Sequence, residues 1–270
     1  GAGMEVEPCM AQRWDISEDG LTYRFSLLPE ARWSDGAPLT AADFEYAWKR
    51  LLEPATHSLI ATLLYDIKNA RAYHLGADAA LSADTIGVRA LDATTLEVVL
   101  EQPTGYFLYV LTNNAACPVP RHVVDQLGTA WAEPSSVVTN GPFRLMQWEQ
   151  KNDQEGEITL ARNLDYPAAS QGNLEQVILR TLPNEAQRLA AYEAGKLDIL
   201  SFRNLSDERE QVRQRHPAEY LSAPLCGVTL KEYVCSPGVP APGTSPTFTH
   251  LFQRFCSTMK GSSPVSLLVT

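Results

Sequence analysis

The sequence predicts an α/β fold of the mixed α+β kind, in which strands and helices alternate along most of the chain. Three observations predict it: an alternating strand followed by a capped helix within residues 21–51, a hairpin pattern within residues 86–100, and a strand–helix–strand pattern within residues 174–200. The 270 residues are enough for one large domain or for two smaller ones.

The first strand is expected over residues 21–27, where apolar and polar residues alternate with the period of a half-buried strand. Thr40 is a natural N-cap for the helix that follows, and Asp43 stands three residues on, as a capping box requires. Pro54 ends this helix, because the residue before a proline disfavours the helical conformation. The apolar face of the helix comprises Phe44, Ala47, Trp48 and Leu51.

The next elements are two strands within residues 86–91 and 95–100, joined by the turn Asp92-Ala93-Thr94. Farther along, Asn140-Gly141-Pro142 forms a sharp turn between two apolar runs. We expect the chain to cross from one domain to the next at this turn.

A strand–helix–strand unit follows. Residues 174–183 are typical of a strand, Asn184 is the expected N-cap of the helix, and Gly195 is the left-handed residue that ends it. Residues 196–200 form the second strand, which is expected to run parallel to the first. A second, polar helix is expected over residues 207–215.

The composition changes after Cys235. Residues 236–270 contain no Asp or Glu and are rich in Pro, Ser and Thr, with neither strand alternation nor a helical period over most of their length. Such a segment buries too little apolar surface to order itself, so the tail is expected to be disordered.

The formal net charge of −10 argues against nucleic acid as a partner, because a phosphate backbone would be repelled. The chain has no run of about 18 apolar residues and no signal-peptide pattern at its start. Its five cysteines lack metal-site spacing. Cys226 and Cys235 would pair if they lay on neighbouring strands; the favoured alternative is that all five are small hydrophobic thiols.

No catalytic motif is present, neither a nucleophile elbow nor a zinc-protease or phosphate-loop pattern, so no catalytic residue, metal site or cofactor is predicted. Asp43 and Glu45 stand two apart on the expected helix, where they point to different sides and would not act on a common bond. Asp43 is better explained as a capping residue.

Residues 10–54 carry an ordered set of aromatic, turn and helix residues. They are Trp14, Asp19-Gly20, Leu21-Thr22-Tyr23, Phe25, Leu27, Trp33-Ser34-Asp35-Gly36, Pro38, Thr40-Ala41, Asp43-Phe44, Trp48 and Arg50-Leu51. In this order and spacing they resemble the signature region of the family 5 extracellular solute-binding proteins, the oligopeptide- and dipeptide-binding components of ABC importers. The resemblance continues to about Tyr233. Trp33 and Trp48 are then expected in the core and not against a ligand.

The resemblance implies a periplasmic-binding-protein-like fold of class II (type C). Residues 4–138 would form an accessory α+β domain and residues 139–235 part of ligand-binding lobe I, with the second lobe missing. Residues 236–270 leave the family pattern. A frameshift or premature end is the favoured explanation for them, and a divergent linker is the alternative.

The resemblance also implies a function. Such a protein captures a short peptide by hinge closure and delivers it to the permease subunits of an ABC transporter. It would lie outside the cytoplasm, in the periplasm or lipid-anchored at the outer face of the cell membrane, and act as a monomer. The alternatives are an inactive truncated fragment, a binder of a nickel chelate, haem or a sugar, and a catalytic or scaffolding protein that reuses the fold.

Candidate ligand-binding residues follow from the matched positions and from the rule that ligands bind at the carboxyl ends of strands. They are Ser201, Phe202, Arg203 and Asn204 after one strand, Cys226, Thr229 and Lys231 on the next strand, and Asn140 and Tyr65. Lys231 stands where some peptide binders carry an acid, so the charge preference for the ligand stays open.

Overall fold

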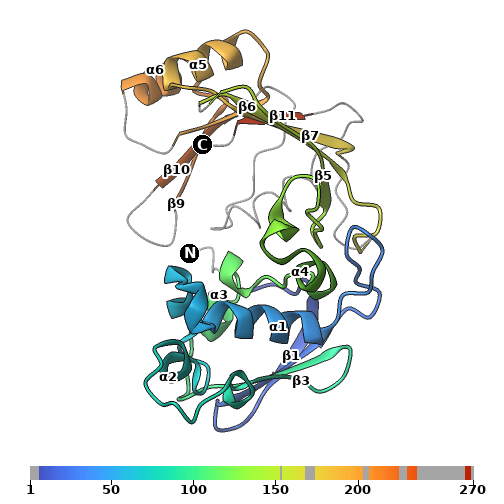
Figure 1. Cartoon of the computed structure of the whole chain (residues 1–270). Coiled ribbons are helices and arrows are strands. Elements are labelled where there is room, and N and C mark those ends of the chain that lie inside the picture. The colour runs from blue at the N-terminus through green and yellow to red at the C-terminus, as the bar shows by residue number, and fades with distance from the viewer. Residues whose placement is uncertain are drawn as a thin grey trace. The chain divides into compact units, whose positions relative to one another are not determined.

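The chain forms two compact units in the computed structural model, Gly1–Asn140 and Gly141–Thr270 (Figure 1). The structure describes residues 6–152, 154–167, 174–202, 207–224, 230–235 and 265–268. The division between the units falls at the Asn140-Gly141-Pro142 turn, close to the boundary that the sequence predicts.

The first unit contains a four-stranded antiparallel sheet in the order β1-β2-β4-β3. The strands are β1 (Ala11–Ile16), β2 (Thr22–Leu27), β3 (Val88–Ala90) and β4 (Thr95–Val99). The predicted strand and the predicted hairpin are confirmed as β2 and as β3–β4. The sequence analysis did not identify β1, whose residues show only a weak alternation.

The predicted capped helix packs on this sheet. Helix α1 (Ala41–Leu52) starts at the predicted N-cap Thr40, whose backbone N–H donates to Asp43 Oδ2 over 2.8 Å, so the capping box is present. Trp48 is 2% exposed, and its indole N–H donates to the carbonyl of Ala116 over 3.0 Å. Glu45 binds Lys49 and accepts a hydrogen bond from the N–H of Ala90, so both acidic residues of this helix have structural partners.

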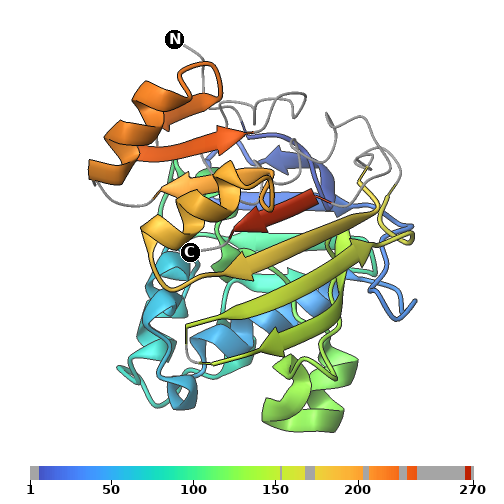
Figure 2. The same cartoon turned by 90° about the horizontal axis from the view of Figure 1, so that it is seen from above.

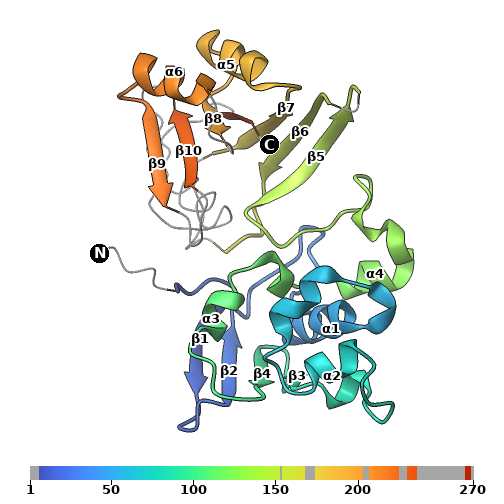
Figure 3. The same cartoon turned by 90° about the vertical axis from the view of Figure 1, so that its left-hand side faces the viewer.

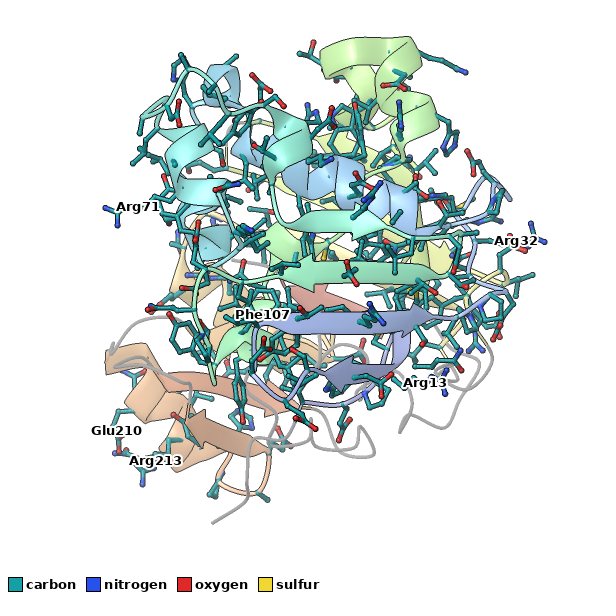
Figure 4. The ribbon with its side chains drawn as sticks, turned by 90° about the horizontal axis from the view of Figure 1, so that it is seen from below. Arg13, Arg32, Arg71, Phe107, Glu210 and Arg213 are labelled. Carbon is teal, nitrogen blue, oxygen red and sulfur yellow. The ribbon has the colours of Figure 1, made fainter. Side chains whose placement is uncertain are left out.

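The core of the first unit lies between the sheet and its helices. Tyr23 and Phe25 of β2 are each 5% exposed, and Phe107 at the start of α3 is fully buried. The rings of Tyr23 and Phe107 meet edge to face with centroids 5.1 Å apart, and Figure 4 shows Phe107 against the strands and Arg13 on the outer side. The remaining helices of this unit are α2 (Ala70–His74), α3 (Phe107–Val110) and α4 (Arg121–Leu127), with short 3₁₀ turns at Pro54–Thr56, Leu59–Leu64, Ala83–Thr85, Asn114–Ala116 and Gly128–Ala132.

The second unit contains a mixed seven-stranded sheet in the order β5-β6-β7-β11-β8-β10-β9. Its strands are β5 (Phe143–Gln150), β6 (Gly156–Arg162), β7 (Gln176–Thr181), β8 (Ile199–Phe202), β9 (Tyr220–Pro224), β10 (Leu230–Cys235) and β11 (Val265–Leu268). The hairpin β5–β6 was not predicted, because its strands are largely exposed or half-buried and their pattern is polar.

The predicted strand–helix–strand unit corresponds to β7, α5 (Glu185–Glu193) and β8. Asn184 caps α5 by accepting from the N–H of Gln187, and Gly195 has φ +68°, both as predicted. β8 begins at Ile199, later than the expected strand. Strands β7 and β8 are both parallel to β11, which confirms their parallel sense, but β11 lies between them.

The tail therefore differs from the prediction of disorder at residues 265–268, which form β11. A strand of four residues gives a sequence pattern too short to recognise. The strands with which β11 pairs, β7 and β8, also lie far from it along the chain. The remaining tail residues lie outside the described part of the chain, as does Cys226, so the proposed pairing of Cys226 with Cys235 stays untested.

Helices α5 and α6 (Asp207–Arg215) lie side by side in the second unit (Figure 3). Helix α6 has the bounds that the sequence predicts. A small core joins the helices to β8: Leu189, Tyr192, Leu197, Leu200 and Val212 are all 7% exposed or less. This core fixes the position of β8 under the helices.

Candidate functional site

Three strand ends come together at one edge of the second sheet. In the register of β8 with β10, Phe202 lies opposite Glu232 and Ser201 opposite Tyr233. In the register of β10 with β9, Leu230 lies opposite Pro224. The end of β8, the end of β9 and the start of β10 therefore meet, and we call this place the β8–β10 edge (Figure 3).

Three of the predicted ligand residues of the second unit lie at the β8–β10 edge. Ser201 and Phe202 are the last two residues of β8, and Lys231 is the second residue of β10. Arg203, Asn204, Cys226 and Thr229 lie outside the described residues, within the two stretches 203–206 and 225–229. In sequence, the first stretch follows β8 and the second separates β9 from β10, so both connect to strands that end or begin at this edge.

The other two candidates belong to the first unit. Tyr65 is half-buried and packs against the core of that unit, with its ring centroid 5.9 Å from that of His74. Asn140 is the last residue of the first unit and is half-buried. The β8–β10 edge is thus built without either residue, and their role in ligand binding stays a prediction.

A polar network lies near the start of β9, at the opposite end of this strand from the β8–β10 edge, and the sequence analysis missed it. The hydroxyl of Tyr192 on α5 donates to Glu219 Oε2 over 2.6 Å. His216 lies between two carboxylates, with its ring nitrogens 3.7 Å from Glu193 and 3.3 Å from Glu219. These contacts hold the end of α5 against the segment between α6 and β9. No local pattern indicates them, because each joins residues on different elements or in a turn.

The first unit contains another contact between a carboxylate and a histidine, Asp35 with His122. Nε2 of His122 lies 2.7 Å from Asp35 Oδ2, and the N–H of Ala37 donates to Asp35 Oδ1 over 3.0 Å. Burial alone would raise the pKa of Asp35, but the hydrogen bond from His122, that from Ala37 and the charge of His122 outweigh it and lower the pKa of Asp35 below its ordinary value of 3.8. His122 also packs edge-on against the buried Trp33, with ring centroids 6.5 Å apart.

Asp35→Asn should therefore reduce stability in a pH-dependent way. A carboxylate whose pKa is lower in the folded state stabilises the fold above its unfolded pKa, and this contribution is lost as the pH falls through the folded pKa. We expect the variant to unfold at a lower temperature than the parent well above pH 3.8, and the difference to shrink below that value and vanish once the pH is below the lowered pKa of the folded state. Thermal unfolding over a pH series measures this. His122→Gln should make the pH dependence smaller, and a difference that stays constant at every pH would contradict the assignment.

The structure offers no metal site or membrane span in the ranges that it describes. There, no three His, Cys, Asp or Glu residues gather closely enough to hold a metal ion. None of the helices in the same ranges has the length and apolar character that crossing a membrane requires.

Two mixed α/β units, one of them with ligand candidates gathered at strand ends, are typical of bacterial solute-binding proteins. The chain belongs to the family described as "Bacterial extracellular solute-binding proteins, family 5 Middle", whose pattern matches residues 5–227.

Similar proteins come from several bacteria. The chain is 37% identical to the dipeptide-binding protein DppE of Bacillus subtilis over 73% of its own length and 35% of that of DppE. It is 39% identical to the probable deoxycholate-binding periplasmic protein YgiS of Escherichia coli over 72% of its length and 36% of that of YgiS. The crystal structure of Haemophilus influenzae OppA in complex with RPPGFSPFR superposes with a TM-score of 0.72 at 30% identity, covering 80% of this chain and 41% of that one.

These comparisons confirm the fold expected from the resemblance, over the part of the solved structure that the chain covers. The chain spans about 35–41% of the length of these relatives. The sequence analysis places the end of the family resemblance at about Tyr233. The family match ends close to it, at residue 227.

Proposed function

We propose that this chain belongs to the substrate-binding component of an ABC importer and that it contributes to capturing short peptides. The observation that carries the proposal is the family match over residues 5–227, together with the dipeptide-binding relative DppE. Next to the β8–β10 edge, β9 is the last strand in the described order of the sheet, so its outer side leaves backbone N–H and C=O groups available to an extended ligand.

The peptide would be held mainly by its backbone and its charged ends. Backbone hydrogen bonds are independent of side-chain identity, so this mode accepts many sequences. Arg203 is the candidate partner for the peptide carboxylate, since a guanidinium binds a carboxylate through two parallel hydrogen bonds. The proposal includes permease subunits as partners, a location outside the cytoplasm, a monomeric state and no catalytic turnover.

A second ligand class is favoured by one specific observation. The relative with 39% identity is described as a probable deoxycholate-binding protein. Deoxycholate, like a peptide, carries one carboxylate, but it has a rigid apolar body in place of a peptide backbone. A carboxylate-binding arginine would serve both ligands, whereas an extended strand edge would serve only the peptide.

The test is isothermal titration of the chain with a mixture of di- to pentapeptides and, separately, with deoxycholate. A ligand at about 100 times its dissociation constant adds about 2.7 kcal/mol of stability, so thermal unfolding gives a second readout. Binding of peptides supports the proposal. Binding of deoxycholate alone would replace the peptide with a carboxylated apolar ligand, and binding of neither would leave an inactive fragment as the explanation.

Arg203→Ala should weaken peptide binding about tenfold or more, because about 1.4 kcal/mol is the scale of one hydrogen bond to a charged group. The matched control is Arg213→Ala on α6, whose side chain is exposed and lies 3.8 Å from Glu210 in a surface ion pair. Figure 4 shows the side chains of Glu210 and Arg213 pointing away from the helix. Equal affinities for the two variants would remove Arg203 from the site.

A further inference from the structure

Strand β11 connects two halves of the second sheet. On one side are β5, β6 and β7, and on the other are β8, β10 and β9. Among the strands that the structure describes, β11 is the only one that pairs with members of both halves. Without it, the order of the sheet has a gap between β7 and β8.

The register shows how β11 fills this gap. Residues 265–268 pair in parallel with residues 177–180 of β7, and Leu267 also pairs with Ile199 of β8. Figure 2 shows β11, in red, running alongside β7 in the same direction. The gap lies in the interior of the sheet, because Val177 is fully buried and Ile199 is 3% exposed.

An empty gap would be costly. Both β7 and β8 would present unpaired backbone N–H and C=O groups on their facing sides, next to buried residues. Parallel strands with both faces covered are rich in aliphatic and β-branched residues. The segment Val265-Ser266-Leu267-Leu268 has this composition and carries no charge.

We propose that the gap between β7 and β8 is a strand-acceptor slot for an uncharged aliphatic segment in parallel sense, occupied by residues 265–268 of the same chain. Strands β10 and β11 meet the same residue of β8 from its two sides. Cys235, the last residue of β10, pairs with Ile199, and so does Leu267 of β11. Strand β10 thus ends beside the start of β8, where Leu267 of β11 also pairs.

The slot is separate from the proposed ligand site but mechanically connected to it. Ile199 begins the four-residue strand β8, which ends with the candidate ligand residues Ser201 and Phe202. Occupying the slot gives β8 a neighbour on each side, β11 and β10. The slot does not depend on the identity of the ligand, so its test measures folding and not transport.

The first experiment uses a chain that ends at residue 260 and a synthetic peptide with the sequence of residues 261–270. We expect the shortened chain to unfold at a temperature several degrees lower, and the peptide to restore the parent value at saturation. The control peptide has Leu267→Pro, which removes a backbone donor from the strand. An unchanged unfolding temperature, or equal rescue by both peptides, would overturn the proposal.

A second pair of variants keeps the proposal testable if the shortened chain does not fold. Leu267→Pro and Leu267→Val are made in the full chain, and amide hydrogen exchange is followed in β7. Protection of residues 177–180 should fall about tenfold or more with proline and stay near the parent value with valine, which preserves the backbone donor. Equal protection in the two variants would overturn the proposal.

The occupant is distinguished by a labelled peptide and by molecular mass. The intact chain should bind fluorescent peptide 261–270 at least about tenfold more weakly than the shortened chain, because its own tail competes for the slot. The intact chain should be a monomer in light scattering. A dimer that dissociates on Leu267→Pro would overturn the intramolecular assignment, since it would mean that the tail occupies the slot of a second copy.

Discussion

Trp48→Ala should lower the free energy of unfolding by about 3–5 kcal/mol, the range for deleting a buried aromatic side chain. Trp48 is 2% exposed and lies in the core cluster between α1 and the sheet of the first unit. The substitution also leaves the carbonyl of Ala116 without its indole donor, which adds the cost of an unpaired buried acceptor. Urea unfolding followed by circular dichroism measures the change.

The control for this variant is Trp148→Ala on β5. It deletes the same side chain at a position that is 50% exposed, so the loss should be within about 1 kcal/mol. Trp48→Phe separates the two contributions, because it keeps most of the apolar volume and removes the donor. Similar losses for Trp48→Ala and Trp148→Ala would show that Trp48 has no core role.

Leu200→Ala should have the second largest effect, a loss of about 2–5 kcal/mol. Leu200 is 1% exposed and packs with Leu197 and Val212 in the small core that holds β8 to the helices. A small core collapses poorly around a cavity, because few side chains are available to fill it. Differential scanning calorimetry detects the loss as a lower midpoint for the second unit.

The same variant connects stability to function. Leu200 directly precedes Ser201 and Phe202, so a cavity beneath it should loosen the β8–β10 edge and weaken ligand binding as well. Leu164→Ala is the matched control, since Leu164 is 77% exposed in the same unit. A stable Leu200→Ala variant, or one as affected as Leu164→Ala, would contradict this description of the core.

The Asp35–His122 pair and the strand-acceptor slot show two different ways in which distant residues are brought together. Asp35 lies in a turn and His122 on α4, and their 2.7 Å contact fixes that turn beside the helix. Residues 265–268 complete a sheet whose neighbouring strands begin at Gln176 and Ile199. In both cases the contact depends on the path of the chain and not on a local pattern.

Local patterns were sufficient where the physical cause is local. The alternation of residues 21–27, the cap at Thr40, the N-cap Asn184 and the left-handed Gly195 depend on neighbours within a few residues. The family resemblance was also readable, because it rests on the order and spacing of many residues over most of the chain. It placed one group of ligand candidates after the strand expected over residues 196–200 and another on the next strand, without showing that the end of β8 meets the start of β10.

The sequence by itself therefore determined the mixed α/β class, the family and the capped helices. Only the tertiary structure decided that β1, β5 and β6 are strands, because their half-exposed residues carry a weak pattern. Only it decided that β11 separates β7 from β8. Hydrogen bonds between strands can join backbone groups that are any distance apart in the sequence. Which strands pair is therefore decided by the folded chain as a whole.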